Sequence, residues 1–178
     1  MNINKKYYGC FDPLPKRPYK PTAIVIHHTC TKSPERTQKA LKEKNYSTHF
    51  EVDMDGTIYQ YADVNLTASH CCGVNSHVIG IDLTHLKDKP FPQVQVDAAK
   101  ELVSYLCHEY GILQVVHTTL EGIWPHCALG NTVCPGGFDM AQLGVCHMDD
   151  IDAILALVDS VKQNGRLDEL REALKKVL

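Results

Sequence analysis

The chain has 178 residues, a formal net charge of −3, 44% hydrophobic residues and 22% charged residues. This length fits one compact domain, the composition is that of a globular protein with a buried core, and the weak negative charge argues against an electrostatic nucleic-acid binder. Ten histidines and eight cysteines stand out, because imidazole and thiolate groups are common metal ligands.

The first 20 residues contain three prolines and no apolar run. We expect them to form an extended arm on the surface rather than a secretory signal or a membrane span. No later stretch reaches the roughly 20 apolar residues that a membrane-spanning helix requires. The sequence therefore predicts a protein made in the cytoplasm, without stable membrane insertion, whose cysteines are reduced thiols or metal ligands. The oligomeric state is left open.

The predicted elements that follow the arm alternate between strand and helix. Ala23–Ile26 is a short apolar run rich in β-branched residues and is typical of a buried strand. Ser33, followed by a proline, predicts the N-cap of a helix that ends near Lys44. The runs 48–53 and 57–61 flank a short turn containing Asp-Gly, which predicts a β-hairpin.

The next segments extend this pattern toward the C-terminus. Residues 78–83 form another apolar run and predict a strand. Apolar residues at helical spacing predict a helix over 94–110, with Gly111 as its C-cap. A short strand is expected at 113–116, followed by a long irregular stretch at roughly 117–137, and a loop of that length in a compact domain is usually functional.

Two helices are expected to close the chain, at about 148–163 and 167–177. The most direct interpretation of the second is that it packs its leucine face against a core. Helices interleaved with a strand-rich middle indicate an α/β fold of the mixed α+β type. We expect a central mixed sheet of about five to six strands, flanked by helices.

The predicted strand at 23–26 ends in two consecutive histidines, His27 and His28. Consecutive strand residues point to opposite faces of a sheet, so the two imidazoles are not expected to reach the same metal ion. One of them is a candidate ligand, and the strand pattern alone does not say which.

A second candidate pair lies in the predicted irregular stretch, where His126 is followed by Cys134. The intervening loop is long enough to fold back on itself, and Gly136 permits a tight turn beside it. Two imidazoles and a thiolate with one open position would be a catalytic zinc set. By spacing alone, His117 and Cys127 are rival ligands.

The motifs taken together resemble a known family. Four segments in order carry the resemblance: Ile24–Thr29, Ser47–Gln60, Asn75–Asp82 and His126–Gly136. With these segments, the chain from Ala23 to Asp139 is similar to the type-2 N-acetylmuramoyl-L-alanine amidases, which include phage amidases, bacterial recycling amidases and animal peptidoglycan recognition proteins.

The resemblance implies a single zinc site at strand ends and Zn²⁺ as the cofactor. It identifies His27, His126 and Cys134 as the three zinc ligands. The same alignment of motifs places His28 at a position that is not a ligand, and it places His117 upstream of the last motif.

Catalytic roles follow from the resemblance, and this chain departs from the family pattern at three of the positions. Asp82 occupies the place where recycling-type members have a glutamate that moves the proton, and it is one methylene shorter. Thr132 occupies the place where many members have a lysine that steadies the oxyanion, so it offers a hydroxyl without a charge. Phage-type members have a catalytic tyrosine where this chain has Thr48, so that role is empty here or is filled by Asp82 or the adjacent His49.

Two further residues match positions that line the substrate groove in the family. The resemblance implies substrate contacts for His70 and Asn75. A structural hydrogen bond is an equally weighted alternative for each of them.

The expected function is hydrolysis of the amide bond between the lactyl group of N-acetylmuramic acid and L-alanine, with peptidoglycan or a muropeptide as the substrate. We expect a phage-type endolysin that acts on the cell wall when it is released through a membrane lesion. The expected organisation is an N-terminal arm at 1–20, a zinc amidase domain at 21–147, and a helical extension at 148–178 that is packed on that domain or appended to it.

The alternatives are a peptidoglycan-binding recognition module without hydrolysis, a cytosolic muropeptide-recycling amidase and an exported antibacterial effector. In the recognition branch of the family, loss of the cysteine ligand accompanies loss of catalysis. The presence of Cys134 therefore favours an enzyme. A structural zinc or redox-thiol protein is disfavoured, because the chain has no Cys-x-x-Cys pair.

Overall fold

The computed structural model describes residues 1–86, 89–116 and 121–147. The chain forms two compact units, Met1–Val145 and Cys146–Leu178, and the described part of the second unit holds the two-residue strand β8 (Cys146–His147). The helices predicted at 148–163 and 167–177, and the rival ligand His117, lie outside the described residues.

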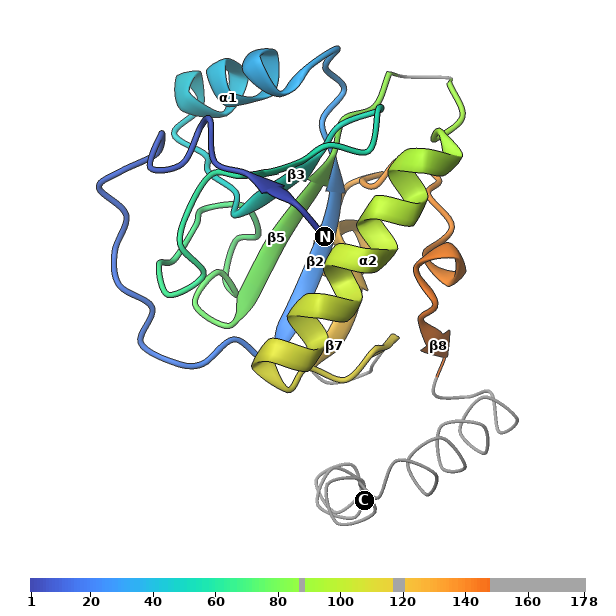
Figure 1. Ribbon diagram of the computed structural model, residues 1–178. Coiled ribbons are helices and arrows are strands. Elements are labelled where there is room, and N and C mark those ends of the chain that lie inside the picture. The colour runs from blue at the N-terminus through green and yellow to red at the C-terminus, as the bar shows by residue number, and fades with distance from the viewer. Residues whose placement is uncertain (87–88, 117–120, 148–178) are drawn as a thin grey trace, which may run out of the picture. The chain divides into compact units, whose positions relative to one another are not determined.

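The centre of the first unit is a mixed sheet in which three parallel strands lie side by side (Figure 1). β2 (Ala23–His28) lies between β5 (Val78–Leu83) and β7 (Gly122–Pro125) and is parallel to both. β3 (Phe50–Val52) continues the sheet parallel to β5, and it pairs antiparallel with β4 (Ile58–Gln60) as the hairpin pattern predicts.

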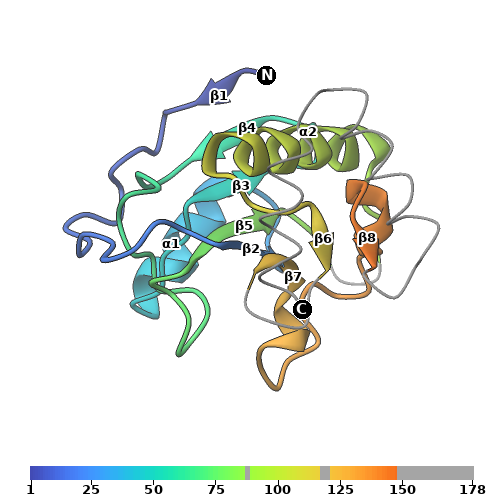
Figure 2. The same cartoon turned by 90° about the horizontal axis from the view of Figure 1, so that it is seen from below.

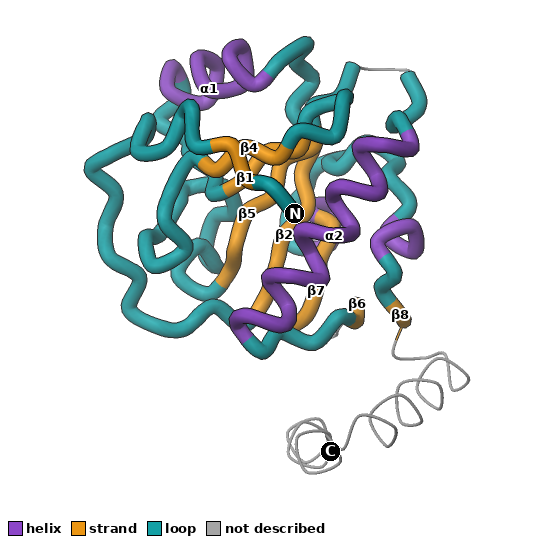
Figure 3. The backbone as a smooth tube through the Cα atoms, in the orientation of Figure 1, coloured by secondary structure: helices purple, strands orange, loops and turns teal. Residues whose placement is uncertain are grey.

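Two short strands extend this sheet at its edges. β1 (Ile3–Asn4) pairs parallel with β4, and β6 (Val115–Val116) pairs antiparallel with β7. Within the first unit the order is therefore β1-β4-β3-β5-β2-β7-β6, and the tube in Figure 3 shows strands of this order side by side. The predicted mixed sheet is confirmed.

The predicted irregular stretch at roughly 117–137 is wrong in one respect, because β7 lies within it. Gly122 opens this strand with φ of +82°, and a Cβ atom there would lie 2.3 Å from the carbonyl oxygen of Val115. The strand has four residues and ends in proline. A short segment with glycine and proline at its ends reads as a loop when only the local pattern is considered.

Two helices flank the sheet and begin and end close to the predicted positions. α1 (Pro34–Glu43) has Ser33 as its N-cap, whose hydroxyl oxygen accepts the N–H of Arg36 at 3.4 Å. α2 (Gln93–Tyr110) ends at Gly111, which adopts the left-handed conformation expected of a C-cap. Figure 2 shows α2 on one side of the sheet and α1 on the other. Neither helix of the described part has the length and apolar character to cross a membrane.

Strand alternation separates an apolar face from a face that carries polar groups. On β2, Ile24 and Ile26 belong to the main core that α2 covers, whereas Val25 belongs to a smaller cluster on the opposite face. His27 follows the same alternation and shares the second face with Val25. The side chain of His27, at the end of β2, therefore lies on the face of the sheet opposite the main core.

The N-terminal arm is more firmly attached than a surface arm would be. Arg17 is 7% exposed, and its guanidinium group donates to three backbone carbonyls, those of Val64, Asn75 and Val78, at 2.9–3.1 Å. A buried cation needs its donors satisfied, and these bonds tie the arm to the loop between β4 and β5 and to the first residue of β5. The prolines from which the surface arm was predicted gave no indication that Arg17 would be buried and hydrogen-bonded in this way.

Candidate metal centre

Three side chains predicted as metal ligands converge at the C-terminal edge of the sheet. His27 ends β2, and His126 directly follows β7, whose Pro125 is paired in register with Ile26. Cys134 comes from the loop after His126. One ligand atom from each of the three lies within 4.8 Å of the others, and this is the one such group among the described residues.

The loop from His126 to Cys134 is closed by backbone hydrogen bonds. The N–H of Cys127 donates to the carbonyl of Cys134 at 2.7 Å, so the two ends of the loop lie side by side. Gly136 then turns the chain with φ of +70°, which an L-residue rarely adopts. The N–H of His28 donates to Sγ of Cys134 at 3.3 Å, and this bond aims the sulfur at the end of β2.

The separation of the donor atoms fits a tetrahedral metal ion. Zinc bonds of about 2.0–2.1 Å to nitrogen and 2.3 Å to sulfur place the two atoms about 3.6 Å apart at a tetrahedral angle. Nδ1 of His27 lies 3.7 Å from Sγ of Cys134. The ring centroids of His27 and His126 are 4.4 Å apart. A donor set of two imidazoles and one thiolate, at this spacing, suits zinc.

The protonation of the three groups also suits a cation. Burial, followed by the neighbouring His126 and His28, lowers the pKa of His27 to about 3, so its imidazole is neutral. Burial lowers the pKa of His126 as well. Burial raises the pKa of Cys134 to about 12, and a divalent cation is the charge that would hold this sulfur as a thiolate.

The rival ligands lie elsewhere in the described part of the chain. The ring of His28 packs against Gly136, where an added Cβ would come within 3.0 Å of it, and meets His85 edge-on at 5.7 Å. Cys127 is exposed. Neither residue belongs to the group formed by the three converging side chains.

Asp82 is the charged residue next to this group. It is paired in register with His27 on the neighbouring parallel strand and is 8% exposed. Burial raises the pKa of its carboxyl group to about 6, against the opposing effect of a hydrogen bond from the Thr48 side chain. Thr48, at the place of the family's tyrosine, is fully buried, and its hydroxyl donates to the carbonyl of Phe50 at 3.5 Å.

Thr132 lies within the loop that carries the cysteine. Its hydroxyl oxygen accepts the N–H of Cys134 at 3.2 Å. The hydroxyl proton is not used in this bond, so the side chain can support the loop and still donate a hydrogen bond outward.

His49 is enclosed behind the candidate centre. Its Nδ1 accepts the N–H of Gly80 at 3.0 Å, and its Nε2 lies 3.1 Å from the carbonyl of Leu66. The side chain is fully buried, and burial lowers its pKa to about 4. These contacts occupy both ring nitrogens, which favours a structural role over the predicted catalytic one.

His70 and Asn75, predicted to line the substrate groove, make hydrogen bonds inside the protein. Nδ1 of His70 lies 2.9 Å from Nε2 of His27. Oδ1 of Asn75 accepts the backbone N–H groups of His70 and Cys71. The bond between His70 and His27 was not predicted from the sequence. Gly80, a glycine inside a buried strand, is the feature that could have indicated a side chain packed closely on that strand.

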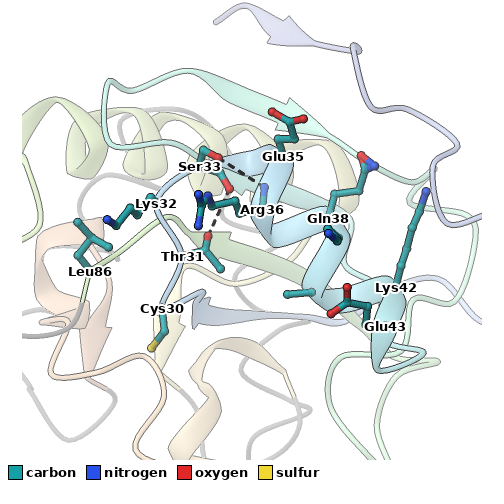
Figure 4. Close-up of a pocket in the computed structure, with 12 residues that line it drawn as sticks. Cys30, Thr31, Lys32, Ser33, Glu35, Arg36, Gln38, Lys42, Glu43 and Leu86 are labelled. Atoms are coloured by element: carbon teal, nitrogen blue, oxygen red, sulfur yellow. Dashed lines mark hydrogen bonds between the residues drawn. The ribbon is translucent and has the colours of Figure 1, made fainter.

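A pocket of about 1060 Å³ opens beside α1, next to the end of β2 (Figure 4). It begins at Cys30 and Thr31, shortly after the two histidines. Most of the residues that line it have polar or charged side chains, namely Lys32, Ser33, Glu35, Arg36, Gln38, Lys39, Lys42 and Glu43. None of the predicted site residues lines it, so this pocket does not contain the candidate centre.

Comparison with known proteins places this geometry in a family. Residues 17–137 match the family model described as N-acetylmuramoyl-L-alanine amidase. A Rickettsia conorii protein named as an amidase of this type is 29% identical over 107 residues, which are 55% of this chain and 40% of that protein. The chain therefore spans well under half the length of this relative.

Solved structures share the fold. An N-acetylmuramoyl-L-alanine amidase endolysin from Clostridium intestinale URNW superposes with a TM-score of 0.69 and 27% identity, over 80% of this chain and 92% of its own. The endolysin of the Thermus scotoductus bacteriophage Ph2119 gives a TM-score of 0.67 at 20% identity, over 80% and 96% of the two chains.

Proposed function

The chain belongs to the N-acetylmuramoyl-L-alanine amidase family, and we propose that it is a zinc-dependent hydrolase that cleaves the amide bond between the lactyl group of N-acetylmuramic acid and L-alanine in peptidoglycan. The observation that carries this proposal is the convergence of His27, His126 and Cys134 at one edge of the sheet. A non-catalytic binding module would not require this cysteine.

These three side chains would hold zinc and leave a fourth position open to water or substrate. When bound there, zinc acts as a Lewis acid and makes water a better nucleophile at neutral pH. His27 and His126 contribute neutral imidazoles, since burial lowers the pKa of each. Cys134 contributes negative charge, and the N–H of His28 supports that charge on Sγ.

Asp82 is the group proposed to move the proton. Its carboxylate takes a proton from the attacking water as the new carbon–oxygen bond forms at the lactyl carbonyl. The same carboxyl group returns the proton to the nitrogen of L-alanine as the carbon–nitrogen bond breaks, so a free amino terminus leaves. A pKa near 6 allows this group to accept and release a proton close to neutrality.

Thr132 is proposed to donate its hydroxyl proton to the carbonyl oxygen on which negative charge develops. A neutral hydroxyl stabilises that charge less than the lysine of other members would. The catalytic role predicted for His49 remains a weaker proposal, because both of its ring nitrogens already have partners inside the protein. An endolysin role is supported by the similarity to the Clostridium intestinale endolysin.

The experiment measures zinc content and the release of L-alanine amino termini from purified peptidoglycan for the wild type, Cys134→Ser and Cys127→Ser. Cys127 is a matched control because it is an exposed cysteine on the same loop. We expect bound zinc and amide cleavage in the wild type and in Cys127→Ser, and the loss of both in Cys134→Ser.

Two results would contradict the proposal. Zinc binding without cleavage of any peptidoglycan would assign the protein to the binding modules. A wild-type protein that binds no zinc would show that the three converging side chains are not a metal site.

A further inference from the structure

The imidazole of His27 is held between two groups, one at each ring nitrogen. Nδ1 faces Sγ of Cys134 at 3.7 Å, on the side of the candidate metal centre. Nε2 faces Nδ1 of His70 at 2.9 Å, on the opposite side. The two imidazoles meet edge-on, with ring centroids 5.1 Å apart. His70 is therefore the hydrogen-bond partner behind the proposed ligand.

The number of protons that the two facing ring nitrogens can share decides which histidine donates the hydrogen bond. Two ring nitrogens 2.9 Å apart share one proton, because two lone pairs or two N–H groups facing each other would repel. A His27 that binds a metal through Nδ1 keeps its proton on Nε2. His70 must then accept that proton at Nδ1 and carry its own proton on Nε2. This arrangement leaves the lone pair of His27 aimed at the metal position.

The position of His70 is set by the strand beneath it. An added Cβ on Gly80 would lie 2.9 Å from the Cγ, Cδ2 and Cε1 atoms of the His70 ring. Gly80 does not have the positive φ that other glycines of the chain show, so it serves close approach rather than a special backbone conformation. The ring of His70 thus lies directly on the backbone of β5.

Two further residues surround His70. His49 meets its ring edge-on, with the centroids 5.7 Å apart. Oδ1 of Asn75 accepts the backbone N–H of His70 at 3.1 Å and that of Cys71 at 2.7 Å, which fixes the local backbone. The residues around His70 therefore allow its ring little freedom to move away from His27.

We propose that His70 is a positioning residue for His27, and that it raises metal affinity by accepting the Nε2 proton and fixing the ring. This inference rests on the zinc site proposed above. It gives His70 and Asn75 a role in the metal centre in place of substrate contact. Loss of such a hydrogen-bond partner typically weakens metal binding by about 10- to 100-fold.

The test is a zinc-affinity measurement on the full chain, by competition with a chromogenic chelator, for the wild type, His70→Ala, His70→Asn and His108→Ala. His108 is the matched control, because it is an exposed histidine on α2. Asparagine can place an amide oxygen close to the position of Nδ1, so it restores an acceptor without restoring a ring. The absorption spectrum of Co²⁺-loaded protein reports the ligand geometry of each variant independently of activity.

We expect His70→Ala to bind zinc about 10- to 100-fold more weakly with an altered Co²⁺ spectrum, His70→Asn to recover part of that loss, and His108→Ala to match the wild type. The inference is overturned if His70→Ala binds zinc like the wild type, or if His70→Asn binds as weakly as His70→Ala. If the wild type itself binds no zinc, the proposed zinc site is wrong, and this inference fails with it. That result differs from a failure of the inference alone, in which the wild type binds zinc and His70→Ala binds it equally well.

Discussion

Asp82 and His27 are paired in register on the parallel strands β5 and β2. Side chains at paired positions of neighbouring parallel strands lie on the same face of the sheet, with their backbones about 4.8 Å apart. The carboxylate therefore stands beside the proposed zinc ligand without being part of the metal-binding group. This placement is what a proton carrier for an attacking water requires.

Replacing Asp82 with asparagine is expected to lower kcat by roughly 10²- to 10⁴-fold while zinc content stays at the wild-type level. The amide keeps the shape of the side chain and removes its ability to accept a proton. Steady-state cleavage of peptidoglycan, together with metal analysis, checks this. Asp82→Glu restores a carboxylate and should retain more activity than Asp82→Asn. Wild-type turnover in Asp82→Asn would show that another group carries the proton.

Replacing Thr132 with valine should reduce kcat by about two- to tenfold, the effect of losing one neutral hydrogen bond. Valine keeps the shape of the side chain but offers no hydroxyl to the developing oxyanion. Thr132→Ser keeps the hydroxyl and should behave like the wild type. Zinc affinity is measured in parallel, because Thr132 also accepts the N–H of Cys134. If the two variants have equal kcat, the hydroxyl has no role in catalysis.

Replacing Gly80 with alanine is expected to weaken zinc binding, although no polar group is removed. The new methyl group would collide with the ring of His70 at 2.9 Å, and such overpacking typically costs about 1–3 kcal/mol of stability. Chelator competition measures the zinc affinity, and thermal unfolding of the metal-free protein measures the stability.

A double-mutant cycle with His70→Ala identifies the cause of that effect. If alanine at position 80 acts by displacing His70, it should add little further loss of zinc affinity in the His70→Ala background. Fully additive losses would mean that Gly80 affects the centre by another route.

The buried carboxyl group of Glu51 is expected to make the folding stability depend on pH. Its side chain is fully buried and accepts hydrogen bonds from the Thr37 and Thr84 hydroxyls, and it is also hydrogen-bonded to the hydroxyl of Tyr61. Burial, opposed by these hydrogen bonds, raises the pKa of Glu51 from 4.5 to about 7. The folded protein therefore binds this proton more tightly than the unfolded chain does.

The direction of the pH effect on stability follows from this difference in proton affinity between the folded and unfolded states. The contribution of Glu51 to stability is complete below about pH 4.5 and is lost as the pH rises through about 7, a total of roughly 3 kcal/mol. We expect denaturant unfolding of the metal-free protein to show this loss between pH 5 and pH 8. Glu51→Gln should remove that part of the pH dependence. An unchanged slope in Glu51→Gln would mean that Glu51 keeps an ordinary pKa in the folded state.

Much of this protein could be predicted from local patterns. Capping and strand periodicity act within a few residues along the chain. They located α1 from the Ser33 cap, the end of α2 from the Gly111 cap, and β5 from the apolar run at 78–83. Motif order and family resemblance singled out His27 and His126, together with their cysteine partner, as the candidate metal ligands.

The tertiary structure alone decided how these pieces meet. β7 was hidden in a predicted loop, and its pairing beside β2 brings His126 to His27. The same holds for His70, whose contact with His27 depends on a loop that Arg17 and Asn75 hold in place. Strand register and the burial of polar groups depend on residues far apart in the chain, so local sequence patterns do not encode them.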